Sequence, residues 1–287
     1  MAWRHIMFVV DPVGHVGPRL LRKLTHLARA LEADVELFES AFEWGVLNQG
    51  GIGSGASDHE THETIQRRDR ELNHVVEALQ ASGIHARGTV NSERPGHIGI
   101  CRHVVASKPD LLVIQTTRHS SLARLLLSYT DFKLIETCPC PVLMLKTEKS
   151  YLEACVVAAV DPMHSHAKPA ALDEAIIDAA SQLATAVGGT LHICHAHTPQ
   201  GREECESRVH ALARRAKLAD DHTHLAGGDP SDVVPRFARS LQADVMVMGA
   251  VSRSALERVL IGYTAERVLD ALNCDVLVVK PLVRSAR

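Results

Sequence analysis

The sequence lacks the features that would direct it to nucleic acid or to a membrane. It has 31 Lys and Arg against 34 Asp and Glu, so its formal net charge of −3 offers no basic field for counterion release. No apolar run approaches the roughly 20 residues that span a bilayer, and the chain begins with a strand-like segment at residues 6–10 rather than a basic leader. We therefore predict no nucleic-acid partner, no membrane partner and a cytoplasmic location.

The sequence also lacks a cysteine framework. Its seven cysteines are odd in number, and several lie in apolar strand-like segments, as do Cys155 and Cys194, which suits reduced thiols better than disulfides. Cys138-Pro-Cys140 is a C-x-C pattern without the two-residue spacing of redox and zinc motifs. We interpret Cys140 and Cys274 as small buried hydrophobic residues at the starts of strands.

No motif of a catalytic phosphate site is present. The sequence has no P-loop, no nucleophile elbow and no Glu-rich metal helix, so the lysine and metal that stabilise phosphoryl transfer are not evident. We therefore expect a binding protein rather than an enzyme, with any ATP hydrolysis slow and incidental.

The most informative stretch is residues 244–280. An apolar strand stops at Gly249, a polar loop follows, Gly262 opens a helix, and a second apolar strand ends at Lys280. Open α/β sheets present a phosphate group to backbone N–H groups in this way. The stretch therefore indicates a nucleotide site.

This stretch occurs twice. Residues 110–146 align with residues 244–280 at a constant offset (244 − 110 = 134), and Val9-Val10-Asp11-Pro12 is echoed by Ala159-Val160-Asp161-Pro162. The duplication predicts two domains of ordinary size, at residues 1–148 and 151–287.

Each half alternates apolar strands with amphipathic helices, which favours a parallel sheet covered on both faces. We predict an α/β fold of two flavodoxin-like doubly wound domains, each a five-stranded parallel sheet of order 3-2-1-4-5. Residues 43–58 are rich in glycine and read as a surface loop, and a helix is expected around Leu126. The expected strands are residues 6–11, 35–42, 84–91, 111–114, 142–146, 155–160, 191–196, 222–226, 245–248 and 276–280.

With the duplication and these motifs in view, the whole chain resembles a tandem universal stress protein, and its second half is most similar to the E type. The most specific residues are Gly228-Asp-Pro-Ser-Asp-Val-Val and the run from Gly262 to Pro281. The resemblance implies that the fifth strands, Val142–Lys146 and Val276–Lys280, pair about a pseudo-two-fold axis. The single chain would then be a pseudo-dimer, and a homodimer of tandem chains is left open.

The resemblance also implies an ATP site in the second half. ATP-binding members carry Gly-x2-Gly-x9-Gly-Ser/Thr after the fourth strand and an Asp after the first. Gly249 and Gly262 match the first and third glycines, while Ser252 and Tyr263 depart from the motif at its second glycine and its Ser/Thr position. The implied nucleotide-binding residues are Ala159, Asp161, Met248, Gly249, Ser252, Arg253, Gly262, Tyr263 and Thr264.

Each of these residues also has a simpler interpretation. Asp161 could cap the following turn, the two glycines could be ordinary turn residues, and Arg253 could be solvated. Thr264 and Glu266 read first as capping and as complements of the helix dipole.

The first half has lost the motif. Gln115, Arg118 and Ser128 stand where the second half has Gly249, Ser252 and Gly262. Because glycines permit close approach of the backbone to a triphosphate, this half should be structural and should not hold ATP in the family manner.

The alternative function is a nucleotide-free interaction module that binds metal or lipid. The chain has 18 histidines, including the His195/His197 and His222/His224 pairs on strands expected to be neighbours. If the four rings shared one sheet face they could hold a tetrahedral zinc ion. The simpler interpretation is a set of solvent-exposed strand ends.

Overall fold

The computed structural model describes residues 2–10, 16–40, 58–91, 96–116, 128–163, 171–197, 202–250 and 262–280. Within these ranges strands and helices alternate in each half. The first half contains β1 (His5–Val10), α1 (Pro18–Leu31), β2 (Asp34–Ser40), α3 (Asp58–Ala81), β3 (Ala86–Asn91), α4 (Gly96–Ser107), β4 (Leu111–Gln115), α5 (Tyr129–Thr137) and β5 (Val142–Leu145). The second half contains β6 (Cys155–Ala159), α6 (Ala171–Ala186), β7 (Thr190–His197), α7 (Arg202–Arg215), the 3-10 turn η1 (Asp220–His222), β8 (Thr223–Gly227), α8 (Pro230–Ser240), β9 (Val245–Gly249), α9 (Tyr263–Ala271) and β10 (Asp275–Val279).

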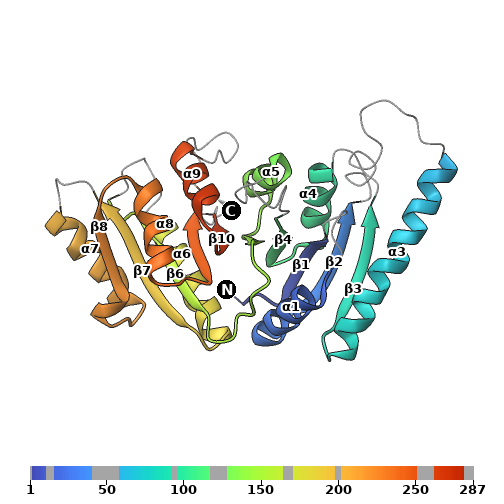
Figure 1. The fold of residues 1–287 in the computed structure, drawn as a ribbon, viewed down its shortest axis with the longest axis horizontal. Helices are drawn as coiled ribbons and strands as arrows, with labels where there is room; N and C mark the ends of the chain where they lie inside the picture. The colour runs from blue at the N-terminus through green and yellow to red at the C-terminus, as the bar shows by residue number, and fades with distance from the viewer. Residues whose placement is uncertain are drawn as a thin grey trace, which may run out of the picture.

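All ten strands form one continuous sheet, and the two halves lie side by side along it (Figure 1). The strand order is β3-β2-β1-β4-β5-β10-β9-β6-β7-β8, so each half has the order 3-2-1-4-5. Strands within each half are parallel, whereas β5 and β10 pair antiparallel, with Val142 opposite Val278 and Met144 opposite Val276. The predicted fold class and the predicted pairing of the fifth strands are confirmed.

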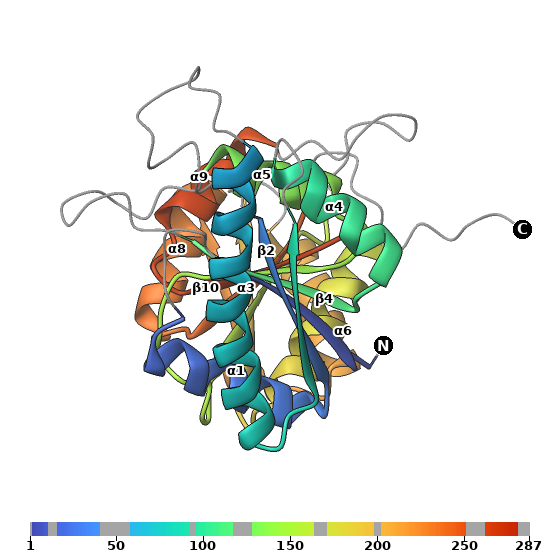
Figure 2. The same cartoon turned by 90° about the vertical axis from the view of Figure 1, so that its right-hand side faces the viewer.

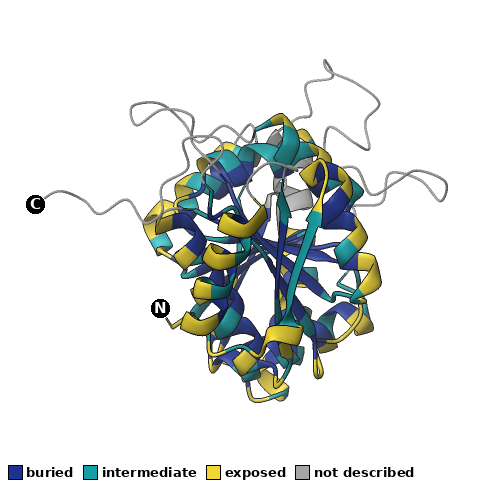
Figure 3. Ribbon diagram, turned by 90° about the vertical axis from the view of Figure 1, so that its left-hand side faces the viewer, coloured by how far each residue is buried: buried dark blue, intermediate teal, exposed yellow. Residues whose placement is uncertain are grey.

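Helices cover both faces of the sheet. The apolar residues of α1, α3, α6 and α7 belong to one buried cluster, and those of α4, α5, α8 and α9 belong to the other. Figure 2 shows α3 lying across the outer end of the first half, and Figure 3 shows buried strands beneath helices whose outer surfaces are exposed. Because each cluster contains residues of both halves, the hydrophobic cores run across the junction without a break.

Most of the helices and strands predicted from the sequence lie within the described residues. Helix α6 ends where Gly188-Gly189 was expected to stop it: Gly188 has a left-handed φ of 63°. A Cβ on Gly189 would lie 2.1 Å from the carbonyl oxygen of Ala154, so only glycine fits this approach. The glycine-rich loop before residue 58 and the helix expected around Leu126 fall outside the described residues.

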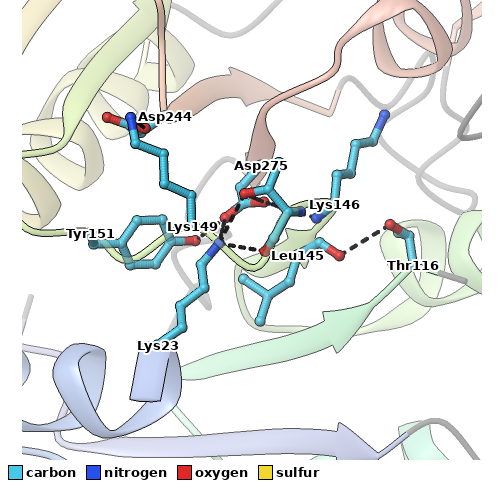
Figure 4. Close-up of polar contacts among 9 residues, drawn as sticks. Lys23, Thr116, Leu145, Lys146, Lys149, Tyr151, Asp244 and Asp275 are labelled. Carbon is cyan, nitrogen blue, oxygen red and sulfur yellow. Dashed lines mark hydrogen bonds and ion pairs between the residues drawn. The ribbon is translucent and has the colours of Figure 1, made fainter. Parts of the chain in front are cut away.

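The junction between the halves contains a buried carboxylate, that of Asp275 at the start of β10 (Figure 4). It accepts hydrogen bonds from the hydroxyl of Tyr151 at 2.5 Å and from the backbone N–H groups of Lys146 and Thr147 at 2.8 and 2.9 Å. It also pairs with Lys23 of α1, whose ammonium donates to the Thr147 carbonyl at 2.7 Å. We call these five residues the junction latch.

The pKa directions in the junction latch follow from its burial. Burial lowers the pKa of Lys23, and the Asp275 carboxylate opposes that shift. Burial also raises the pKa of Tyr151 well above its ordinary value, so the phenol stays a neutral donor. The latch thus joins a lysine of the first half to a carboxylate of the second.

Two lysines extend the pseudo-two-fold symmetry to the helix ends. Lys146, just after β5, donates to the carbonyls of Leu269 and Leu272 at the end of α9. Lys280, just after β10, donates to the carbonyl of Cys138 at the end of α5. A positive charge at a helix C-terminus is favourable, so each half stabilises a helix of the other.

Candidate nucleotide site

The carboxyl edge of the second half brings together most of the predicted nucleotide-binding residues. Strands β6 and β9 are parallel neighbours, so Ala159 at the end of β6 and Asp161 just after it meet the same edge as Met248 and Gly249 of β9. Met248 is buried, whereas Ala159 and Asp161 are half-buried. Gly262 opens α9, the helix between β9 and β10, whereas the predicted contacts of Ser252 and Arg253 lie outside the described residues.

Two buried side chains fix the turn that carries Asp161. The backbone N–H of Asp161 donates to Oδ1 of Asp173 in α6 at 3.0 Å. The carbonyl of Val160 lies 2.9 Å from Nδ1 of His195, and Nε2 of that ring lies 3.4 Å from Sγ of Cys205 in α7. Sequence reasoning missed Asp173 and Cys205, because a helix residue gives no sign of which turn it reaches.

Gly249 has a packing role. A Cβ at this position would lie 2.7 Å from Cδ2 and 2.8 Å from Cγ of Leu172 in α6. Gly249 does not have a positive φ, so this position requires glycine for its lack of a side chain rather than for its backbone freedom. That Gly249 also belongs to a phosphate-binding loop remains a prediction.

A Gly249→Ala variant should therefore lose about 1–3 kcal/mol of unfolding free energy, because the new methyl group overpacks against Leu172. Denaturant unfolding measures this loss. In the double variant Gly249→Ala/Leu172→Ala the total cost should be smaller than the sum of the two single costs, since the clash is gone. Additive costs would contradict the proposed contact.

The N-terminus of α9 differs from its counterpart in the first half. Helix α5 begins with a capping box: Asp131 N–H donates to the Ser128 hydroxyl at 3.1 Å, and Ser128 N–H donates to the Asp131 carboxylate at 2.8 Å. At the equivalent positions α9 has Gly262, which makes no side-chain cap, and Ala265, which has no polar side chain. The first-turn donors of α9 thus lack the carboxylate and hydroxyl that serve α5.

The other predicted residues of this helix are exposed or half-buried. Thr264 was predicted to cap α9, but the N-cap position belongs to Gly262, so that prediction is wrong; Glu266 does lie in the first turn as predicted. Tyr263 is 71% exposed, and the guanidinium of Arg267 lies 5.7 Å from the centroid of its ring. A positive charge therefore lies one turn from the helix N-terminus.

Comparison with known proteins decides the family. The model of the universal stress protein family matches residues 2–146 and again residues 155–280. The chain belongs to the universal stress protein family. Two matches in tandem over nearly the whole chain make it a tandem universal stress protein, a member of a family that acts in the stress response.

Two relatives match this tandem universal stress protein over nearly its full length. Universal stress protein E of Salmonella typhi is 26% identical over 305 residues, covering 97% of this chain and 95% of its own. A solved protein of unknown function from Pseudomonas aeruginosa PAO1 is 28% identical, covers 98% of this chain and 93% of its own, and has a TM-score of 0.76. A universal stress protein solved in complex with cAMP also matches, at 26% identity over 45% of this chain and 98% of its own, with a TM-score of 0.37.

The zinc hypothesis for this tandem universal stress protein is wrong, because its histidines lie on opposite faces of the sheet. His195 points to the α7 side, where it meets Cys205. His224 instead meets His192 at 3.0 Å and Phe237 of α8, and His222 stacks on His192 at 4.4 Å. Successive side chains of a strand point to opposite faces of the sheet, so His192 and His195 of β7 lie on opposite faces. His222 and His224 lie on the His192 side, so the four rings of the predicted site cannot share one ion.

The described ranges contain neither a metal-ligating cluster nor a membrane-spanning helix. Among those residues, no group of three or more His, Cys, Asp or Glu side chains could hold a metal ion. Within the same ranges, every helix is too short or too polar to cross a membrane.

Proposed function

We propose that this tandem universal stress protein binds one adenine nucleotide, ATP, in its second half, and that its first half is structural. The observation that carries the proposal is the difference between the two equivalent helix N-termini. Helix α5 has a built-in capping box, whereas α9 opens on Gly262 with no side-chain cap. The family motif runs through this same position.

The uncapped end of α9 suits a phosphate chain. Aligned peptide dipoles place about half a positive charge at a helix N-terminus, and free N–H groups donate to phosphate oxygens. Arg267 adds positive charge nearby and offsets the Glu266 carboxylate of the first turn, where the Thr264 hydroxyl also lies. In this proposal the loop residues Ser252 and Arg253 complete the phosphate contacts.

The opposite end of the nucleotide would lie against the turn after β6. Asp161 follows that strand at the carboxyl edge, and the half-buried Ala159 and the buried Met248 offer apolar surface there. In this proposal the Asp161 carboxylate accepts a hydrogen bond from the adenosine. The contacts of Asp173 and His195 with the Asp161 turn hold that acceptor in place.

The first half is expected to exclude ATP for an electrostatic reason. The Asp131 carboxylate already lies on the helix end that a phosphate would use, so a phosphate there would meet a fixed negative charge. Gln115 also stands in place of the glycine that ends β9. We therefore assign this half the structural role of completing the sheet and the junction.

The proposed activity is binding rather than catalysis, in the cytoplasm. The sequence has neither the P-loop lysine nor the metal ligands of a phosphoryl-transfer site, so any hydrolysis would be slow. All seven cysteines are free thiols, which suits a reducing compartment.

Mass spectrometry of small molecules released from freshly purified, tag-free protein tests this function. We expect an adenine nucleotide, either retained through purification or taken up during equilibrium dialysis against excess ATP. A protein that neither retains nor takes up an adenine nucleotide would contradict the proposal and favour a nucleotide-free interaction module.

A further inference from the structure

Two cysteines of the first half lie side by side on the α4 and α5 side of the sheet. Sγ of Cys101 in α4 is 3.5 Å from Sγ of Cys138, the C-cap residue of α5. Cys101 is half-buried, whereas Cys138 is fully buried. Both are free thiols, and 36 residues of sequence separate them, so the C-x-C pattern at 138–140 did not reveal the pair.

We propose that Cys101 and Cys138 form a peroxide-reactive dithiol that closes into an intramolecular disulfide. Cys101 is the attacking thiol because it is the more accessible of the two. Cys138 is the resolving thiol because it is buried directly behind Cys101. This proposal does not depend on nucleotide binding.

The surroundings of Cys101 favour its thiolate. Its Sγ lies 2.9 Å from Oγ1 of the exposed Thr137. That hydroxyl also donates to the Lys133 carbonyl at 2.5 Å, so it serves the sulfur when its single hydrogen turns away from that carbonyl. Lys280, which crosses from the second half, brings a positive charge to the same place by donating to the Cys138 carbonyl. The thiol of Cys138, the Thr137 hydroxyl and the charge of Lys280 together lower the pKa of Cys101 to about 6, against the opposing effect of burial.

The pKa of Cys138 moves in the opposite direction. Its hydrogen bond to Cys101 and its burial raise that pKa, so Cys138 keeps its proton while Cys101 reacts. The other thiols are poor competitors. Burial raises the pKa of Cys155, which is half-buried like Cys101, and raises those of Cys140 and Cys274 to about 11 and about 12.

The chemistry balances with one peroxide as the oxidant. The Cys101 thiolate attacks a peroxide oxygen, so an S–O bond forms, the O–O bond breaks, and hydroxide leaves and takes up a proton to become water. The Cys138 sulfur then attacks the sulfur of the Cys101 sulfenic acid, so the S–S bond forms and the S–O bond breaks. The departing hydroxide takes the Cys138 proton and leaves as a second water.

Closing the bond needs a small movement. The two sulfur atoms must approach from 3.5 Å to about 2.05 Å, the length of a disulfide bond. The offset of 134 places Pro235 and Leu272 at the equivalent positions of the second half, so that half has no such pair. The reaction is therefore specific to the first half.

The test uses the full-length, tag-free, reduced chain and one equivalent of hydrogen peroxide. Remaining thiols are blocked with N-ethylmaleimide, and the linkages are mapped by mass spectrometry of peptides. We expect the free thiols to fall from seven to five, with Cys101 linked to Cys138 within one chain. A linkage between chains, a linkage to Cys140, or oxidation of Cys101 no faster than that of Cys155 would overturn the proposal.

Single variants separate the two roles. In Cys138→Ser the sulfenic acid at Cys101 should persist and be trapped by dimedone, because the resolving thiol is gone. In Cys101→Ser, Cys138 should stay reduced under the same treatment. The matched control Cys155→Ser removes the other half-buried thiol and should leave the Cys101–Cys138 disulfide unchanged. Oxidation of Cys138 in Cys101→Ser at the wild-type rate would refute the assigned order.

Discussion

Replacing Asp275 with alanine should lower the free energy of unfolding by about 3–5 kcal/mol, the range for removing one partner of a buried ion pair. The variant leaves the ammonium of Lys23 buried at 1% exposure without its counter-ion. It also deprives the Tyr151 hydroxyl and the N–H groups of Lys146 and Thr147 of their acceptor. Denaturant unfolding measures the loss, and the halves should separate more readily because the latch spans their junction.

Two further variants complete this test. Lys149→Met removes an ion pair with Asp244 in which Lys149 is 67% exposed, so it should cost about 1 kcal/mol or less. Lys23→Met/Asp275→Leu replaces the whole buried pair with apolar side chains and should be more stable than Asp275→Ala alone. An Asp275→Ala loss no larger than that of Lys149→Met would show that the junction latch does not hold the halves together.

Transferring the capping box of α5 to α9 should abolish most ATP binding. In the variant Gly262→Ser/Ala265→Asp, the new hydroxyl and carboxylate would occupy the first-turn donors, as Ser128 and Asp131 do in α5. The added negative charge would also repel the phosphates. We expect ATP affinity to fall at least about tenfold, which is about 1.4 kcal/mol of binding free energy.

The matched control works in the first half. Ser128→Gly/Asp131→Ala removes the capping box of α5 and should cost about 1 kcal/mol of stability. ATP affinity in the second half should not change in this control. Calorimetric titration compares both variants with the wild-type chain, and wild-type affinity in Gly262→Ser/Ala265→Asp would place the phosphates elsewhere.

The fold was predictable because its signals are local or repeated. Leu20, Leu24, Leu27 and Leu31 recur at helical spacing and all lie on the buried side of α1. The apolar fifth strands repeat at one offset, and the family resemblance implied the pairing about a pseudo-two-fold axis that β5 and β10 form. The junction latch could not be predicted in the same way, since Lys23 and Asp275 are 252 residues apart and no local pattern pairs them.

The site was predictable only in part. The motif located Gly249 and Gly262, but the contact of Gly249 with Leu172 depends on how α6 packs, which no local pattern encodes. The capping box of α5 could have been found, because Ser-x-x-Asp before an apolar turn is a known signature. The zinc prediction from the histidine pairs was wrong because alternation shows which residues of one strand lie on the same face. It does not show which residues of a neighbouring strand lie on that face too.

Calorimetric titration of the reduced, tag-free chain with ATP tests the central claim most directly, because the claim is an asymmetry between two halves of one fold. The open N-terminus of α9 and the capping box on α5 predict a stoichiometry of one nucleotide per chain. A stoichiometry of two would show that the capping box does not exclude ATP, and it would contradict the account.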